Sequence, residues 1–447
     1  MQRTLAKDTP EKIGEEVLLK GWVMTVRAHG KIAFFDLKDR SGVLQIGAFE
    51  PEQIRNVNAL SQQDAVEVVG KVKKREEKFV NPNLPLGTVE IEAKEVRVIA
   101  KASEMPFDMG GKDLKLELPT LFDHRSLALK HPKIAKIFKV QAALASEFRR
   151  AAEELDCTEI FVPTIAKGAT EGGAEVFKVD YYGHKAFLTQ SPQLYKQIMV
   201  GVFERVFTIA KAYRAEPSVT TRHLSEATQM DIEIGFIEKF EDLLDALEFV
   251  GTRMIKNASE KNKDILSEFG ASVPLVPAKV PRLSLREAQD IVGKRTGRDL
   301  SKELDLNPED EKEICDWAKE EHKSDFVTVT HFSTKKRAFY TMPDPKDPQY
   351  SLSYDLLFRG LEILSGSQRI HELPKLIERM KEKGVDPKSF GMYLMAFKFG
   401  MPPEGGFSFG LERVTMKLLE LYNVREASLF PRDMERVDER LSEGQNK

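Results

Sequence analysis

The stretch Thr228–Phe236, with the sequence TQMDIEIGF, carries the strongest fold signal in the chain. Its residues alternate between apolar and polar, as they do in a β-strand with one buried face. The apolar positions are Met230, Ile232, Ile234 and Phe236, and the polar positions are Gln229, Asp231, Glu233 and Gly235. Such a polar face is often simply solvated. Because this one has two carboxylates and an amide but no lysine, we favour a face turned toward a ligand.

A second strand is predicted just before it, at Arg205–Arg214, with the sequence RVFTIAKAYR. The connection between the two strands, residues 215–227, contains Glu216, Arg222 and His223. Arginine forms forked hydrogen bonds to phosphate oxygens, so this connection, next to a strand-end arginine, suits a polyphosphate and a base. The alternative is an ordinary charged hairpin tip.

The segment Gly405–Arg413, with the sequence GGFSFGLER, is a second candidate for ligand binding. Its glycines allow the backbone to approach a ligand closely. Arg413 falls in the first turn of the predicted helix that follows, and a helix N-terminus with an arginine makes an anion site. The chain has neither a GxxxxGK[ST] loop nor a GxGxxG motif. A nucleotide must therefore bind in a site of a different architecture.

Residues 354–369 give a third signal. Arg359-Gly360 can turn a hairpin, which would bring Asp355 and Glu362 onto neighbouring strands. Two carboxylates with the hydroxyl of Ser365 form a hard oxygen site suited to Mg²⁺ shared with phosphates. The alternative, a pair of carboxylates bonded to arginines, is equally compatible with this segment alone.

The composition excludes several classes of protein. The chain has 447 residues, only two cysteines and a net charge of −3. Two cysteines cannot make a disulfide framework or a four-thiolate zinc site, and no apolar run reaches the roughly 20 residues of a membrane span. The first residues lack the apolar stretch of a secretory signal, so we expect a cytoplasmic protein. A nucleic-acid partner would have to be met by local basic patches.

The pattern changes along the chain and predicts two domains. Residues 1–104 contain five short runs rich in Val, Ile and Phe, which predict a small β-barrel. The runs are Val17–Arg27, Lys31–Lys38, Val43–Ala48, Ala65–Lys74 and Thr88–Ile99. Residues 105–130 are predicted to be a hinge. Residues 131–447 alternate helices and strands, beginning with a helix at Pro132 and a short strand at 159–162. Within them, 281–336 carries two helical patterns and is interpreted as an insertion.

In this order, these segments resemble the class II aminoacyl-tRNA synthetases, most closely the aspartyl-tRNA synthetases of archaeal and eukaryotic type. Pro163, Tyr213–Asp231 and Gly410–Arg413 resemble the three motifs of that class, and Thr170–Ala174 and Gln190–Gln197 resemble its aspartyl signatures. The resemblance implies an α+β fold, namely an antiparallel-sheet catalytic domain with an N-terminal OB-fold β-barrel, working as a homodimer.

The resemblance also implies a role for each matching residue. The residues implied for ATP are Arg214, Glu216, Arg222, His223, Glu362 and Arg413, of which Arg214 and Arg413 are also implied to be catalytic. Those implied for Mg²⁺ are Asp355, Glu362 and Ser365. Those implied for L-aspartate are Glu171, Ser191, Gln193, Lys196, Asp231, Ser365 and Arg369. Those implied for the tRNA anticodon are Arg27, His29, Phe34 and Gln45.

The implied reaction has two steps: aspartate and ATP form aspartyl-adenylate, and the aspartyl group then passes to the 3′ end of tRNA(Asp). A desolvated carboxylate requires cationic partners, which Lys196 and Arg369 would supply, whereas asparagine would leave them uncompensated. The histidine at position 29 resembles the nondiscriminating members of the family, which charge tRNA(Asn) as well as tRNA(Asp). Met24 favours the same range of tRNA substrates. Glu404 stands where relatives commonly have histidine. The alternative functions are an asparaginyl enzyme and a non-catalytic RNA-binding relative. For Phe34, the alternative to base stacking is a place in the barrel core.

Overall fold

A computed structural model describes residues 1–81, 86–168, 175–217 and 220–441. The chain divides into two compact units, Met1–Leu116 and Glu117–Lys447. In the described part of the chain, no helix is both long and apolar enough to cross a membrane.

The first unit is a closed five-stranded barrel with strand order β1-β2-β3-β5-β4. The strands and the one α-helix are β1 (Glu16–His29), β2 (Ile32–Lys38), β3 (Val43–Ala48), α1 (Pro51–Asn58), β4 (Ala65–Lys74) and β5 (Val89–Ala100). Each strand begins and ends within two residues of a predicted run. Alternate residues of β2, such as Phe35, fill the barrel core, while Phe34 is only partly buried and faces outward. The predicted barrel is confirmed, and the barrel-core alternative for Phe34 is wrong.

The second unit is built on an eight-stranded, mainly antiparallel sheet with the order β12-β13-β14-β15-β16-β11-β10-β6. Its strands are β6 (Thr158–Glu159), β10 (Arg205–Tyr213), β11 (Glu226–Gly235), β12 (Arg282–Ser284), β13 (Phe326–Thr330), β14 (Ser353–Phe358), β15 (Glu362–Gln368) and β16 (Glu404–Gly410). A smaller sheet comprises β7 (Ile165–Ala166), β8 (Lys178–Tyr181) and β9 (His184–Leu188). The predicted α+β antiparallel-sheet fold is therefore confirmed.

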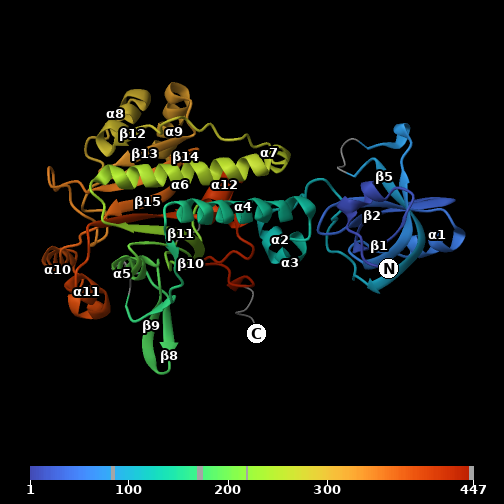
Figure 1. The fold of residues 1–447 in the computed structure, drawn as a ribbon, viewed down its shortest axis with the longest axis horizontal. Helices are drawn as coiled ribbons and strands as arrows, with labels where there is room; N and C mark the ends of the chain where they lie inside the picture. Colours follow the sequence, from blue (N-terminus) through green and yellow to red (C-terminus); the bar gives the residue numbers. More distant parts are fainter. Residues whose placement is uncertain (82–85, 169–174, 218–219, 442–447) are drawn as a thin grey trace. The chain divides into compact units, whose positions relative to one another are not determined.

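Two long helices, α4 (Pro132–Glu154) and α6 (Phe240–Lys261), cover one face of the large sheet (Figure 1). Leu144 and Val250 of these helices pack in one core with Ile232 and Phe409 of the sheet. The remaining α-helices described in this unit are α2 (Leu118–Asp123), α3 (Arg125–Ala128), α5 (Gln193–Phe203), α7 (Lys263–Glu268), α8 (Leu285–Thr296), α9 (Pro308–His322), α10 (Leu373–Glu382), α11 (Gly391–Lys398) and α12 (Leu411–Leu418). The apolar side of the central strands is thus buried by α4 and α6, which leaves the polar side for a site.

Three details differ from the sequence-based expectations. The short strand predicted at 159–162 is β6, which ends at Glu159 after two residues paired with β10. Phe236, predicted on the apolar face of its strand, lies just beyond β11 and is exposed. Residues 281–336 do contain two helices, α8 and α9, but they also supply β12 and β13. These two strands extend the main sheet, so the segment is continuous with it at one edge.

Candidate active site

A row of polar side chains crosses four neighbouring strands on the face of the sheet opposite α4 and α6. The strand register pairs Asp231 with Ser408, Ser408 with Ser365, and Ser365 with Asp355. Ser408 Oγ donates a 3.0 Å hydrogen bond to Asp231. One carboxylate thus lies at each end of the row. The polar face predicted for Thr228–Phe236 therefore lines a candidate site and is not simply solvated.

A fully buried group of ion pairs lies beside the Asp231 end of this row. Arg369 Nε donates to Glu233 Oε1 at 2.7 Å, and Lys196 Nζ lies 3.1 Å from Glu233 Oε2 and 2.8 Å from Asp231 Oδ1. Burial raises the pKa of Asp231 above its ordinary value. At Glu233, burial acts in the same direction, but Arg369 and Lys196 outweigh it and hold the pKa of Glu233 below its ordinary value. The two cations and two carboxylates balance in charge.

Gly406 makes the Arg369–Glu233 pair possible. It is the register partner of Glu233 on β16, and a Cβ atom there would lie 2.2 Å from Glu233 Oε2. Its carbonyl oxygen accepts a 3.0 Å hydrogen bond from Arg369 Nη2. The glycine predicted to let the backbone approach a ligand therefore lets the backbone approach this ion pair instead.

The Asp355 end of the row is held by Arg337. Arg337 donates to Asp355 Oδ2 at 2.7 Å and to Ser365 Oγ at 3.0 Å, and its guanidinium lies 4.1 Å from the Phe332 ring centre. Burial raises the pKa of Asp355 to about 6 in spite of this arginine. The second carboxylate oxygen, Oδ1, is buried and has no hydrogen-bond partner among the described residues. The predicted turn at Arg359-Gly360 is confirmed, because both residues have positive φ angles, 48° and 79°.

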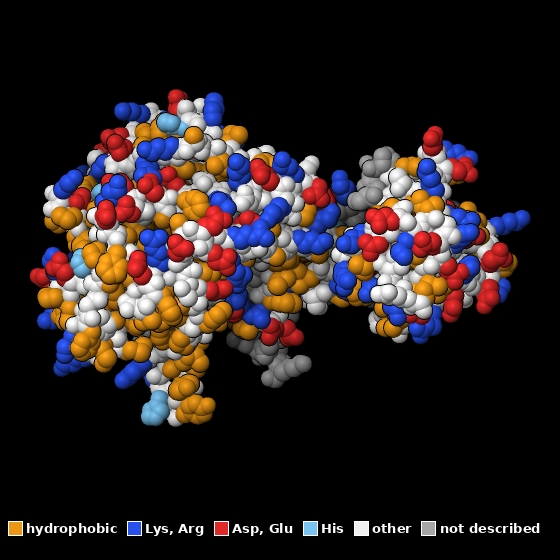
Figure 2. Space-filling model, in the orientation of Figure 1, with side chains coloured by type: hydrophobic (Ala, Val, Ile, Leu, Met, Phe, Trp, Pro, Cys, Tyr) orange, Lys and Arg blue, Asp and Glu red, His pale blue; other side chains and the backbone are white. Residues whose placement is uncertain are grey.

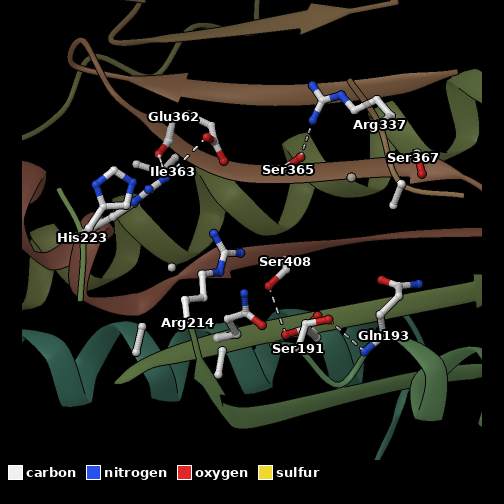
Figure 3. A pocket seen from close by; sticks show the side chains of 18 of the residues that line it. Ser191, Gln193, Arg214, His223, Arg337, Glu362, Ile363, Ser365, Ser367 and Ser408 are labelled. Atoms are coloured by element: carbon white, nitrogen blue, oxygen red, sulfur yellow. Dashed lines mark hydrogen bonds and ion pairs between the residues drawn. The ribbon is translucent and has the colours of Figure 1, made fainter. Parts of the chain in front are cut away.

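A third part of the site, around Arg413 and Arg222, is rich in cationic side chains. Arg413 of α12 lies 3.4 Å from Glu362 Oε2, and Arg222 lies 3.2 Å from Glu311 Oε2 of α9. Burial, and then repulsion by Arg413, lower the pKa of His223, so this imidazole is neutral near pH 7. Arg214 points into the space that Ser365 and Arg337 face from the opposite side (Figure 3). Such a concentration of guanidinium groups suits a polyphosphate.

Most of the predicted site residues line one cavity of about 470 Å³. They are Ser191, Gln193, Lys196, Arg214, Arg222, His223, Asp231, Glu362, Ser365, Arg369 and Arg413. Glu216 is not among the lining residues, and Asp355 lies behind Arg337. Glu171 is outside the described residues. The amino-acid end and the phosphate end of the predicted site are therefore one continuous space.

Sequence reasoning did not assign two residues that organise this site. Glu233 lies on the same strand face as Asp231, so the two-residue alternation could have identified it. Arg337 follows the segment interpreted as an insertion, and no pattern in the sequence marks it. Its position depends on the contact between the end of that segment and β14, which only the fold reveals.

The barrel has a cavity of its own, of about 850 Å³, lined by Arg27, Phe34 and Gln45 among others. Phe34 packs edge-on against Phe49, with ring centres 5.9 Å apart. Arg75 donates a 2.7 Å hydrogen bond to Gln45 Oε1, which leaves the amide N–H groups of Gln45 available as donors. His29 is the last residue of β1, and its side chain lies outside the described part of the structure.

Comparison with known families accounts for both units. Residues 117–434 match the family described as tRNA synthetases class II (D, K and N), and residues 17–99 match the OB-fold nucleic acid binding domain. The chain belongs to the class II aminoacyl-tRNA synthetases and carries an OB-fold domain of the anticodon-binding kind.

Relatives narrow the class further. The chain is 41% identical to an aspartate–tRNA(Asp/Asn) ligase of Thermus thermophilus, covering 97% of this chain and 99% of that protein. It is 37% identical to an aspartate–tRNA(Asp) ligase of Pyrococcus horikoshii, covering 96% and 97%. An asparaginyl-tRNA synthetase structure from Pyrococcus horikoshii superposes with a TM-score of 0.88 at 30% identity, covering 98% and 99%.

Proposed function

We propose that this chain is an aspartate–tRNA ligase. It activates L-aspartate with ATP to give aspartyl-adenylate and pyrophosphate, and then transfers the aspartyl group to the 3′ end of tRNA(Asp). The observation that carries the proposal is the buried Lys196–Arg369 group in the same cavity as Arg214 and Arg413. One end of that cavity suits an acidic side chain, and the other suits a triphosphate.

The side-chain specificity follows from the charges. An aspartate carboxylate that leaves water needs charge-assisted hydrogen bonds, and Lys196 and Arg369 are held in place to give them by Asp231 and Glu233. Asparagine offers a neutral amide that cannot replace those bonds. An asparaginyl enzyme is therefore less consistent with this pocket, although the fold is common to both kinds. A non-catalytic protein would have no need of Arg214, Glu362 and Arg413 in one cavity.

For the first chemical step, the chain contributes positioning and charge rather than a nucleophile. The α-carboxylate of aspartate attacks the α-phosphorus of ATP, and pyrophosphate leaves. Arg214 is proposed to hold the α-phosphate, and Arg413, with Arg222 and His223, the phosphates that depart. Fixed guanidinium groups that face the developing negative charge lower the barrier without a large rearrangement.

The residues at the Asp355 end fit Mg²⁺. The buried Oδ1 atom of Asp355 has no partner among the described residues, and Glu362 and Ser365 add oxygen donors. The described residues contain no group of three or more acidic, histidine or cysteine side chains arranged to hold a metal ion by themselves. Mg²⁺ needs none, because it is commonly held by one or two carboxylates together with phosphates and water. When bound, the ion would neutralise phosphate charge. Arg337 would fix the positions of Asp355 and Ser365 by its hydrogen bonds to both.

The barrel cavity is proposed to bind the anticodon. Phe34 offers a partly exposed ring for stacking on a base, and Gln45, oriented by Arg75, offers hydrogen-bond donors to a base edge. Arg27 supplies positive charge at the same groove. On the strength of His29 and of the Asp/Asn relatives, we propose that tRNA(Asn) is charged as well as tRNA(Asp).

A homodimer is proposed from exposed apolar side chains in the second unit. Phe161, Val202 and Phe236 are 87%, 63% and 67% exposed. Phe161 and Phe236 follow the ends of β6 and β11, and Val202 lies in the last turn of α5. Figure 2 shows hydrophobic side chains gathered over α5 and the β8–β9 hairpin. A contiguous apolar surface of this kind is usually covered by a partner. Sedimentation of the purified chain and of a Phe161→Lys variant tests this.

ATP–pyrophosphate exchange with the purified chain tests the activity. Exchange that depends on aspartate supports the proposal. Exchange with asparagine alone would identify an asparaginyl enzyme, and exchange with neither would favour a non-catalytic protein. Aspartylation of tRNA(Asp) and tRNA(Asn) transcripts side by side then measures the tRNA scope; rejection of tRNA(Asn) by several orders of magnitude would refute the broader assignment.

A further inference from the structure

Glu404 is a buried carboxyl group to which the proposed reaction gives no role. It is the first residue of β16 and has no exposed surface. Its backbone is held on both sides, because it pairs with Gly235 of β11 and its carbonyl oxygen accepts a 2.8 Å hydrogen bond from the N–H of Arg369. It does not line the cavity itself. It therefore lies immediately behind the residues that do.

A hydrogen-bond relay fixes the orientation of this carboxyl group. The hydroxyl of Tyr393 donates to Gln197 Oε1 at 3.1 Å, which commits the amide of Gln197 to donate its N–H. Gln197 Nε2 then donates to Glu404 Oε1 at 2.8 Å. The other oxygen, Oε2, is buried and has no partner among the described residues. One oxygen is thus held as an acceptor, and the other is free to carry a proton.

The charges around Glu404 decide its protonation state. Lys196 and Arg369 are already balanced by Asp231 and Glu233, all four of them buried. An ionised Glu404 would leave this dry region with an excess negative charge, in the place where an aspartate side chain brings another. Burial, and then repulsion by Glu233, raise the pKa of Glu404 well above its ordinary value.

We propose that Glu404 is a neutral, proton-bearing carboxyl group that keeps Lys196 and Arg369 available for the substrate carboxylate. It is a positioning residue, because it acts through Gln197 and the buried ion pairs and not on the substrate. An ionised carboxylate at this position would compete with aspartate for Arg369 and Lys196. The neutral acid still accepts the hydrogen bond from Gln197 but does not compete with the substrate for the two cations. The proposal rests on the proposed aspartate pocket and adds a further determinant of its specificity.

Glu404 is surrounded by charged or titratable groups from several elements, and all of them bear on its proton. They are Glu233 of β11, Lys196 of α5, Tyr393 of α11, and Arg369, which follows β15. Glu233 differs from Glu404 in accepting two hydrogen bonds from Arg369 and an ion pair from Lys196. Two carboxyl groups in one buried cluster are therefore assigned opposite protonation states, and a matched pair of glutamine substitutions can separate them.

Infrared spectroscopy of the full-length protein in D₂O tests the proton directly and independently of activity. The expected result is a carbonyl band of a protonated carboxylic acid that persists from about pH 6 to about pH 8, well above the ordinary carboxyl range. The band is lost in Glu404→Gln, and in Glu233→Gln it should disappear at a lower pH than in the unsubstituted protein, because the repulsion by Glu233 is gone. Because burial also raises the pKa of Glu311, to about 7, the band is assigned from a difference spectrum, and Glu404→Leu provides a second one if Glu404→Gln does not fold. A difference spectrum with no acid band assignable to Glu404 overturns the proposal.

Exchange kinetics with aspartate test the role. Glu404→Leu, which leaves Gln197 without its acceptor, is expected to raise the KM for aspartate about tenfold, and Glu404→Gln to restore it to within about threefold. Glu233→Gln is expected to have the larger effect of the two glutamine variants. If Glu404→Gln is impaired as severely as Glu404→Leu, an ionised carboxylate is required and the proposal fails. Lack of exchange in the unsubstituted protein would instead refute the proposed function, and the infrared band would still report the proton.

Discussion

Substitution of Arg369 by glutamine separates its two roles, in folding and in substrate recognition. Arg369 gives Glu233 two hydrogen bonds, of 2.7 Å and 3.3 Å, and also bonds to Ser367 and Gly406. Removal of one member of a fully buried ion pair leaves the other charge uncompensated, which lowers the free energy of unfolding by about 3–5 kcal/mol. Arg369→Gln should therefore be measurably less stable in chemical denaturation.

The double variant Arg369→Gln/Glu233→Gln removes the stranded charge, so most of the lost stability should return. Recognition should not return, because a partner for the substrate carboxylate is still missing. Loss of such a buried charge pair costs the complex about 2–5 kcal/mol, so aspartate-dependent exchange should stay about 30- to 5,000-fold below that of the unsubstituted protein. The KM for ATP serves as the control and should change little. If the double variant recovered both stability and aspartate activation, the recognition role of Arg369 would be refuted.

Three further substitutions test other parts of the structure. Hydrogen bonds from Ala102, Lys101 and Ser61 outweigh burial and hold the pKa of Asp64 below its ordinary value. That stability is present above about pH 4 and is lost as the pH falls further, so Asp64→Asn should unfold about 1–3 kcal/mol more easily at pH 7 and match the unsubstituted protein in strong acid. Asp355→Asn should raise the Mg²⁺ concentration for half-maximal exchange about tenfold; unchanged Mg²⁺ dependence would remove it from the site. Phe34→Ala should weaken tRNA binding in a filter assay by about 1–3 kcal/mol and leave exchange intact.

The elements that could be predicted from the sequence are those whose signal is local. The five barrel strands and β11 have a two-residue alternation set by which side chains face the core. Arg359-Gly360 forms a turn that only certain backbone angles allow, and Pro132 stands at the start of α4. The short strand β6 could not be delimited in this way, because its end depends on pairing with β10, a partner far along the chain.

Site residues that belong to a sequence motif could be predicted individually. Site residues that reach the site only through tertiary contacts were missed. Asp231 and Arg369 could be named from the sequence. The alternation placed Glu233 on the same face as Asp231 without indicating its partner, and nothing in the sequence marked Arg337. Glu233 holds the arginine, and Arg337 holds Asp355, through side chains brought together by strands distant in sequence. The glycine of β16 illustrates the same limit, because Gly406 makes room for an ion pair and not for a ligand.

The polar row Asp231–Ser408–Ser365–Asp355 takes one residue from each of four strands, and the next residue on β11 and β16 belongs to the hydrophobic core. A slip of β16 by one position would replace Ser408 with a phenylalanine and turn a serine into the core. Partly assembled versions of the pocket are therefore not stable intermediates. The amides of these four strands should exchange their hydrogens together, and binding competence should return in refolding only when the whole sheet is in register.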